Sequence, residues 1–195
     1  MTKNFYLVRH AQYDNPLKIL AGRLPVTLSE LGIGQAKKLS EFFFDKKIEL
    51  IYSSPVKRCQ QTSEIIANTV IPIEYDVRLA ETFSPYQGYW ELDWSHFYGH
   101  HEELGGESPQ DISLRMMDFW QSIVKKDEKN CIICSHGDPL YLLFAQLTGL
   151  TIPSIKEITS ILGDEYQPTG SVRKIVVEGD DVRTENVVTF TETAY

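Results

Sequence analysis

The stretch Phe5-Tyr6-Leu7-Val8-Arg9-His10 indicates the fold most directly, because four apolar residues end abruptly at an arginine and a histidine. A second stretch of similar form, Cys131-Ile132-Ile133-Cys134-Ser135-His136, lies far along the chain. A continuous apolar run of this length is typical of a central strand that helices cover on both faces. The two stretches therefore predict buried strands, each of which ends at a histidine.

The rest of the chain alternates short apolar runs with helix-like stretches. Further strands are expected at residues 50–52 and at 71–75, where Pro72 suits an edge strand because it cannot donate to a ladder. The first helix is expected to span about 15 residues from Ser29. The second is expected to begin at the N-cap Ser54, with Pro55 at its first position, and to end at about 67. Two more helices are expected over 109–126 and from 137 to about 149. Two runs, 172–177 and 182–188, flank Gly179-Asp180 and predict a hairpin. This order predicts a three-layer α/β/α fold whose sheet is mostly parallel, with an antiparallel margin.

Length and composition restrict the classes of protein to which the chain could belong. Its 195 residues favour one domain over 1–195, with an insertion at about 81–108. No run approaches about 20 apolar residues, so we expect no membrane span. The first residues lack a secretory pattern, so we expect a cytoplasmic protein. The formal net charge of −8 argues against nucleic-acid binding, which usually needs a basic surface.

The three cysteines admit more than one interpretation. Cys131 and Cys134 have the C-x-x-C spacing of a redox pair or of half a zinc site. In a strand, however, residues three apart point to opposite faces, and no second cysteine pair completes a zinc site. We therefore favour buried structural thiols, Cys59 included.

Cationic and polar side chains follow three of the expected strands. Arg9 and His10 follow the first, Ser53 and Ser54 follow the second with Arg58 one helical turn later, and Ser135, His136 and Gly137 follow the fourth. Ligands of open α/β sheets bind at the carboxyl ends of the strands, and guanidinium groups match the oxygen atoms of phosphate. Flanking arginines favour the neutral form of an imidazole, which nucleophilic attack requires. The set predicts phosphoryl transfer. Because the sequence has neither a Walker-type loop nor an Asp-x-Asp pair, we expect no metal ion and no other cofactor.

These motifs give the chain a resemblance to the histidine phosphatase superfamily, also called the phosphoglycerate mutase-like family. Order and rough spacing hold over about residues 4–150, and the matching stretches are 7–12, 22–32, 51–62, 78–81, 105–108 and 134–137. The resemblance implies a phosphoglycerate mutase-like fold, with His10 as the nucleophile that becomes phosphohistidine. It also implies that Arg9, Arg58 and His136 complete the phosphate pocket. Glu81 would protonate the leaving oxygen and later activate water.

The phosphatase branch of the family is the one that the chain resembles most. This resemblance implies a metal-independent phosphomonoesterase that hydrolyses a small phosphorylated metabolite. Two alternatives stay open: phosphoglycerate mutase-type phosphoryl transfer, and a non-catalytic phosphate-binding relative. The mutase ranks lower because the Ser/Thr and Trp-Asn that follow the histidine in mutase-type members are replaced by Gln12-Tyr13-Asp14-Asn15. The sequence predicts no oligomeric state.

An acidic protein with an anionic substrate needs local positive charge in its pocket. We expect that charge from Arg9, Arg58 and a helix N-terminus, together with a protonated His136. Arg23, Asn15 and Gly137 are expected as substrate-binding residues of lower rank.

Other positions depart from the family pattern or have a second interpretation. Ala11 stands where the family usually has glycine, which is tolerated if the backbone there does not need a positive φ. The aromatic residues from 83 to 98 either pack the insertion onto the core, which we favour, or line a pocket for an organic leaving group. His96, His100 and His101 lack a carboxylate or cysteine partner at helical spacing and are not expected to hold metal.

Overall fold

The computed structural model of the chain describes residues 2–91, 100–158 and 165–190. Its centre is one sheet with the strand order β3-β2-β4-β1-β5-β6, and β7 pairs with β5. The strands are β1 (Thr2–Arg9), β2 (Leu50–Ser53), β3 (Ile73–Tyr75), β4 (Asn130–Ser135), β5 (Ser171–Glu178), β6 (Asp181–Thr184) and β7 (Val188–Thr189). β3, β2, β4 and β1 pair parallel, whereas β5 pairs antiparallel with β1, β6 and β7. The prediction of a mostly parallel sheet with an antiparallel margin is confirmed.

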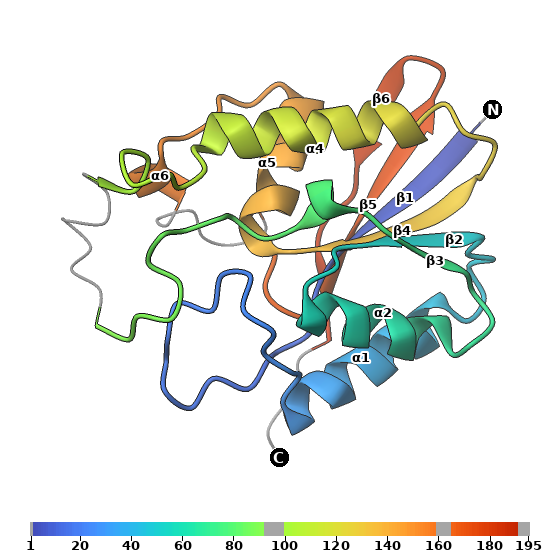
Figure 1. Cartoon of the computed structure of the whole chain (residues 1–195). Helices are drawn as coiled ribbons and strands as arrows, with labels where there is room; N and C mark the ends of the chain where they lie inside the picture. Colours follow the sequence, from blue (N-terminus) through green and yellow to red (C-terminus); the bar gives the residue numbers. More distant parts are fainter. Residues whose placement is uncertain (1, 92–99, 159–164, 191–195) are drawn as a thin grey trace.

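Helices cover both faces of the sheet (Figure 1). The helices α1 (Glu30–Phe43) and α2 (Lys57–Ala67) lie on one face, and α4 (Pro109–Ile123) and α5 (Gly137–Thr148) lie on the other. A 3₁₀ turn, η1 (Val77–Leu79), and the short α6 (Ile155–Ile158) complete the described elements. None of the helices in the described part of the chain is long and apolar enough to cross a membrane.

The alternation of side chains along β1 explains why its apolar run is continuous. Phe5 and Leu7 belong to the hydrophobic cluster that contains residues of α4 and α5, whereas Tyr6 and Val8 belong to the cluster that contains residues of α1 and α2. Successive residues of a strand point to opposite faces, so a strand between two helical layers needs apolar residues at every position. The two clusters are the two halves of a three-layer core.

The cysteines follow the same alternation along β4. Cys131 packs in the α4–α5 cluster and Cys134 packs in the α1–α2 cluster, on the opposite face of the sheet. Both thiols, and that of Cys59, are free and buried. The prediction of structural thiols is confirmed.

Element boundaries differ from the prediction at three places. The helix α2 begins at Lys57 with Val56 as its N-cap residue, so the prediction of Ser54 as N-cap and Pro55 as first residue is wrong. The Ser54 hydroxyl lies instead 2.9 Å from His136 Nε2, inside the protein. The helix α4 ends at Ile123, three residues early, because the chain turns there with a hydrogen bond from Lys126 N to Ile123 O. The last predicted strand is divided into β6 and β7, which pair with different parts of β5.

The start of α1 presses against the backbone that follows His10. A Cβ atom added to Gly32 would lie 1.8 Å from the carbonyl oxygen of Gln12. Ser29 caps the same turn by accepting a hydrogen bond from Gly32 N at 3.0 Å. The close approach of helix and loop therefore requires glycine at this position.

We expect Gly32→Ala to lower the free energy of unfolding by about 1–3 kcal/mol, since an added methyl group in a filled contact forces the backbone to shift. Urea denaturation followed by circular dichroism measures the change. The matched control is Lys37→Ala on the exposed side of the same helix, which should change stability by no more than about 0.5 kcal/mol. Equal stability of the Gly32→Ala protein and the wild type would contradict the close packing of α1.

Candidate active site

The carboxyl ends of β1, β2 and β4 meet at one edge of the sheet. His10 N donates to Ser135 O at 3.0 Å, and Ser54 N donates to Cys134 O at 2.9 Å. These backbone hydrogen bonds continue the ladders beyond the strands and hold the three following turns in fixed register. The side chains of these turns and of α2 therefore start from neighbouring backbone positions.

Arg58, from the first turn of α2, lies at the centre of the site and is 1% exposed. Its Nε donates to His10 Nε2 at 3.0 Å, and its Nη2 donates to His136 Nδ1 at 2.9 Å and to Glu81 Oε2 at 3.3 Å. Nη2 also contacts the carbonyl oxygen of Gly22 at 2.9 Å. Its Nη1 has no hydrogen-bond partner within the described residues. A buried guanidinium donor without a partner is well placed to bind an anion.

The hydrogen bonds of His10 determine which ring nitrogen carries the proton. Nδ1 lies 2.8 Å from the carbonyl oxygen of Ala11, which can only accept, so Nδ1 is the donor. Nε2 accepts from Arg58 and therefore holds a lone pair. Burial lowers the pKa of His10 well below its ordinary value, and the charges of Arg58 and Arg9 lower it further. The ring is neutral at pH 7 and has a nucleophilic Nε2.

His136 is held as a neutral ring in the same way. Its Nδ1 accepts from Arg58, and its Nε2 donates to Ser54 Oγ at 2.9 Å. Burial lowers the pKa of His136 well below its ordinary value, and the neighbouring charges of Arg58, then His10 and Arg9, act in the same direction. The expectation of a protonated His136 is therefore wrong for this arrangement, because the positive charge at the site already comes from arginine.

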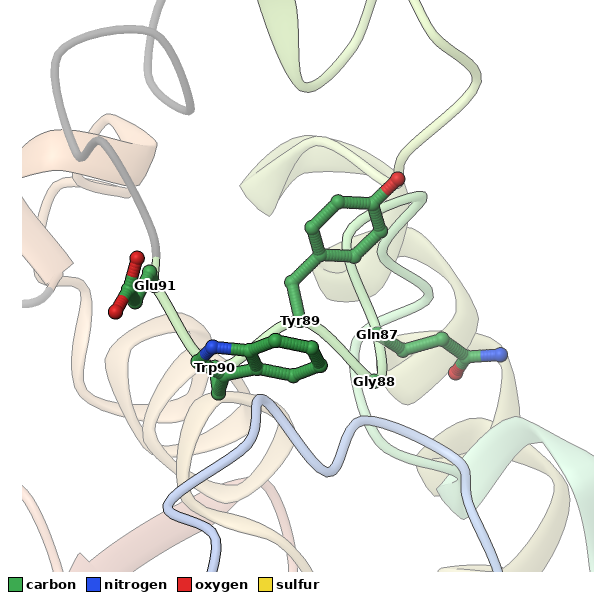
Figure 2. A pocket seen from close by; sticks show the side chains of 5 residues that line it. All are labelled: Gln87, Gly88, Tyr89, Trp90 and Glu91. Atoms are coloured by element: carbon green, nitrogen blue, oxygen red, sulfur yellow. The ribbon is translucent and has the colours of Figure 1, made fainter.

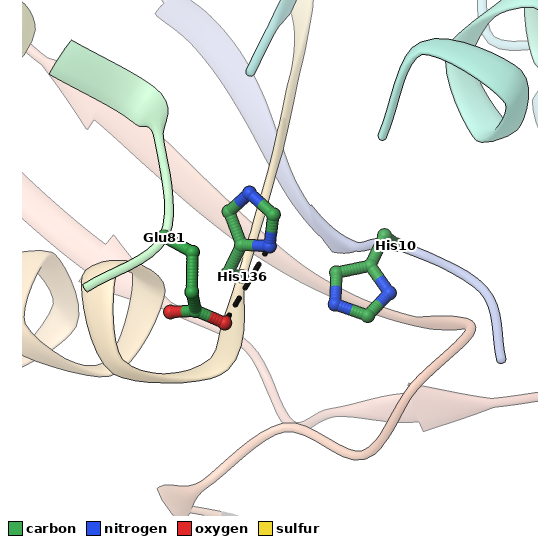
Figure 3. A group of neighbouring side chains, drawn as sticks. All are labelled: His10, Glu81 and His136. Atoms are coloured by element: carbon green, nitrogen blue, oxygen red, sulfur yellow. Dashed lines mark ion pairs between the residues drawn. The ribbon is translucent and has the colours of Figure 1, made fainter. Parts of the chain in front are cut away.

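Glu81, which follows η1, points its carboxylate toward the two histidines (Figure 3). Oε1 accepts from Thr82 N at 2.9 Å, and Oε2 lies 3.5 Å from His136 Nδ1. Burial raises the pKa of Glu81, as does the nearby charge of Asp138, whereas Arg58 opposes the rise. The side chain is 18% exposed, so the carboxyl group still reaches the edge of the site. A carboxyl group with a raised pKa can serve as an acid near neutral pH.

The spacing of these groups also resembles that of a metal site. Ligand atoms of His10, Glu81 and His136 all lie within 4.8 Å of one another. Arg58, however, donates hydrogen bonds to all three side chains. A metal cation at this point would face the guanidinium at short range, where little water screens the repulsion. The donor set fits an anion better than it fits a metal ion.

Arg9 lies beside this group without a hydrogen bond to it in the described part of the chain. Its Nη1 donates to the carbonyl oxygen of Gln167 at 2.7 Å, and its guanidinium lies 5.3 Å from the centre of the Tyr166 ring. Its Nε is buried and has no partner among the described residues. Arg9 and Arg58 thus each have an unpartnered donor. Sequence reasoning missed Tyr166 and Gln167, because nothing in residues 165–167 indicates which strand end they contact.

Gly137 begins α5 and contacts Tyr166 closely. A Cβ atom at this position would lie 2.2 Å from the Tyr166 hydroxyl, so the tyrosine requires glycine here. The prediction that Gly137 binds substrate stays a prediction. Its observed effect is to let Tyr166 approach the start of the helix.

The two other predicted substrate residues have partners within the protein. Arg23 Nε donates to the carbonyl oxygen of Glu81 at 2.7 Å, and its Nη2 forms an ion pair with Glu107 at 2.8 Å. Arg23 therefore lies at the edge of the site, against the backbone of Glu81. Asn15 exchanges two hydrogen bonds with the backbone of Ile19 and so closes its own loop. Their roles in substrate binding stay predictions.

Ala11 is accommodated without strain in the backbone. It is fully buried, is not among the residues with positive φ, and packs with Leu28 and Ala36. Its N–H donates to Thr62 Oγ1 at 3.1 Å. The backbone at Ala11 does not need a positive φ, so a methyl group is tolerated at this position.

The described part of the aromatic insertion borders a cavity of about 470 Å³. Residues 87–91 line it, and the side chains of Tyr89 and Trp90 are largely exposed (Figure 2). Exposed rings do not support the favoured interpretation that this part of the insertion packs onto the core.

Trp94, His96, Phe97 and Tyr98 lie outside the described residues. His100 pairs with Glu103 at 2.9 Å, and His101 is buried against the carbonyl oxygen of Glu107.

Comparison with known proteins places this arrangement in a family. The sequence profile of the histidine phosphatase superfamily (branch 1) matches residues 5–186. A relative from Hydrogenobacter thermophilus, named putative phosphoserine phosphatase 2, is 30% identical over 192 residues, which cover 91% of either chain. A metal-independent phosphoserine phosphatase of Arabidopsis thaliana is 28% identical over 160 residues, which cover 73% of this chain and 67% of the relative.

A solved structure shows the same fold. YhfR of Bacillus stearothermophilus matches with a TM-score of 0.81 at 25% identity, and the match covers 94% of this chain and 96% of that one. The family profile spans nearly the whole chain, residues 5–186. The chain therefore belongs to the histidine phosphatase superfamily, branch 1.

Proposed function

We propose that this protein is a metal-independent phosphomonoesterase that hydrolyses a small phosphorylated metabolite through a phosphohistidine intermediate on His10. The observation that carries the proposal is the buried guanidinium of Arg58. It touches the nucleophile, the acid and the second histidine, and it keeps an unpartnered donor in the described part of the site. One group thus binds the phosphate and aligns the residues that react with it.

The first half-reaction transfers the phosphoryl group to the enzyme. Arg58 Nε turns its N–H from His10 Nε2 to an oxygen of the bound phosphate, which frees the lone pair of Nε2. That lone pair attacks phosphorus while the bond between phosphorus and the ester oxygen breaks. Glu81 gives its proton to that oxygen, so that the alcohol leaves as a neutral molecule. His10 Nδ1 keeps its proton and donates it in a hydrogen bond to the carbonyl oxygen of Ala11. This hydrogen bond stabilises the positive charge that develops on the ring.

The second half-reaction uses the same groups in the opposite direction. The Glu81 carboxylate takes a proton from water, and the water oxygen attacks phosphorus. The bond between phosphorus and Nε2 then breaks, inorganic phosphate leaves, and the electron pair returns to the ring. Donors of Arg58 and Arg9 stabilise the charge on the phosphoryl oxygens in both halves.

The acid supports one class of substrate. A proton from Glu81 matters most for the ester of an alkyl alcohol, because an alkoxide leaves poorly without a proton. Since two relatives are named phosphoserine phosphatases, phosphoserine is the first substrate to test.

Replacing His10 with alanine removes the nucleophile. We expect hydrolysis of phosphoserine or of a generic alkyl phosphate to fall by roughly 10³-fold or more, and no acid-labile phosphoenzyme should form. Release of phosphate with EDTA present, together with ³²P labelling of the denatured protein, measures both effects. His100→Ala, which changes an exposed histidine that pairs with Glu103, is the matched control and should keep full activity.

Four results would count against the proposal. Turnover by the His10→Ala protein, or loss of wild-type activity in EDTA, would remove the phosphohistidine route or its independence from metal. Conversion of a phosphoglycerate to its isomer without release of phosphate would indicate a mutase. Binding of vanadate without any labelling of the wild type would indicate a non-catalytic relative.

Replacing Glu81 with glutamine removes the acid and the base but keeps the size of the side chain. For an alkyl phosphate we expect kcat/KM to fall roughly 10²–10⁴-fold. For p-nitrophenyl phosphate, whose leaving group needs no proton, we expect a burst of nitrophenolate followed by slow turnover, because water lacks its base. Rapid-quench kinetics distinguishes the two phases. An equal loss of kcat/KM for both esters would show that Glu81 is not the acid.

A further inference from the structure

Asp138 is a second carboxylate close to Glu81, and its role is not explained by phosphate binding. It lies in the first turn of α5, two residues after His136. Its Oδ2 accepts from Thr82 Oγ1 at 3.1 Å, and its Oδ1 accepts from the Tyr166 hydroxyl at 2.6 Å. Each carboxylate oxygen is thus held by a hydroxyl group from a different segment of the chain.

Thr82 connects this carboxylate to the acid. Its backbone N–H donates to Glu81 Oε1 at 2.9 Å, while its hydroxyl group donates to Asp138. One residue therefore bridges two carboxylates. The direction of the Glu81 side chain depends on this bridge, since the bond from Thr82 fixes Oε1 while Oε2 faces Arg58.

Tyr166 connects the same carboxylate to the phosphate side of the site. Its ring lies 5.3 Å from the Arg9 guanidinium, and the next residue, Gln167, accepts from Arg9 Nη1. The requirement for glycine at position 137 follows from the approach of this hydroxyl group. Asp138 is therefore the point at which the segment carrying the acid and the segment holding Arg9 are joined.

We propose that Asp138 is a positioning residue for Glu81, which it orients through Thr82 and keeps protonated by its own negative charge. The inference rests on the proposed phosphatase reaction, in which Glu81 must carry a proton when the substrate binds. A negative charge close to a buried carboxyl group disfavours ionisation of that group, and burial acts in the same direction. Asp138 accepts from two hydroxyl groups, which hold its carboxylate at one end of the bridge that leads through Thr82 to Glu81.

Other charges near Glu81 act against Asp138. Arg58 donates to the Glu81 carboxylate, and the charge of Arg9 also favours ionisation of Glu81. His136 is neutral, and Arg23 and Arg115, both paired with Glu107, contact the backbone carbonyl of Glu81 rather than its carboxylate. Burial and Asp138 outweigh these cations, and the pKa of Glu81 is raised. Asp138 is the neighbouring charge that acts most strongly on Glu81, and it favours the protonated form.

The test is Asp138→Asn, which removes the charge and keeps the size of the side chain. The protonated acid is required, so kcat/KM for an alkyl phosphate falls as pH rises through the pKa of Glu81. Without Asp138 that pKa drops, and the fall should move to lower pH by about one unit. At a fixed pH above the midpoint, the ratio of kcat/KM for an alkyl phosphate to that for p-nitrophenyl phosphate should decrease roughly tenfold.

Matched variants separate charge from structure. Asp138→Glu restores the charge and should return the pH midpoint toward that of the wild type. Thr82→Val removes the hydroxyl bridge while it keeps the backbone donor to Glu81, and should lower the alkyl-to-aryl ratio by a smaller factor. Asp180→Asn, in an exposed turn, controls for a general change of charge and should leave the profile unchanged.

An unchanged midpoint with an equal loss of kcat/KM for both esters would overturn the inference, because it would make Asp138 a merely structural residue. If the wild type hydrolyses neither ester, the proposed function fails and the inference is tested by a different readout. In that case the ¹³C resonance of the Glu81 carboxyl, assigned with Glu81→Gln, is titrated in the wild type and in the Asp138→Asn protein. Equal titration midpoints of Glu81 in the two proteins would then overturn the inference independently of the proposed function.

Discussion

The guanidinium of Arg58 carries a positive charge in a place that water hardly reaches, since its side chain is 2% exposed. Burial of an ion costs several kcal/mol unless partners compensate for the lost hydration. His10, His136, Glu81 and the carbonyl oxygen of Gly22 supply those partners. The geometry of both histidines follows from this compensation, because each ring must turn a lone pair toward Arg58. The rest of the sheet edge is arranged to hold these acceptors.

The same constraint explains how a protein with a formal net charge of −8 can offer a site to an anion. Burial lowers the pKa of both histidines, and the charges of Arg58 and Arg9 lower it further, so both rings are neutral and the cationic character of the site comes from arginine. Surface charges farther away than about 8 Å are largely screened at physiological ionic strength. A small pocket with two arginines can therefore attract one phosphate group, although the protein as a whole is acidic. A neutral His10 is also the form that can attack phosphorus.

Much of the fold and part of the site could be predicted from the sequence, because both depend on local patterns. Continuous apolar runs such as Phe5–Val8 identify strands with two covered faces, and parallel strands bring their carboxyl ends to one edge. The placement of Arg9, Arg58 and His136 near His10 follows from that rule alone. The prediction of Ser54 as N-cap was wrong because the helix begins two residues later, and the Ser54 hydroxyl group contacts both Val56 N and His136 Nε2. Tyr166 could not be predicted, because its contact with Asp138 joins segments that no periodicity relates.

The three-layer fold, the edge at which the chemistry lies and the residue types that meet there are all present in the sequence, since they follow from periodicity and from the ends of strands. The protonation state of those residues depends on the tertiary structure. The neutral form of His136, the lone pair on His10 Nε2 and the raised pKa of Glu81 depend on burial and on distances to Arg58 and Asp138. Protonation responds to charges a few ångströms away and to the exclusion of water, and neither quantity is encoded in local sequence.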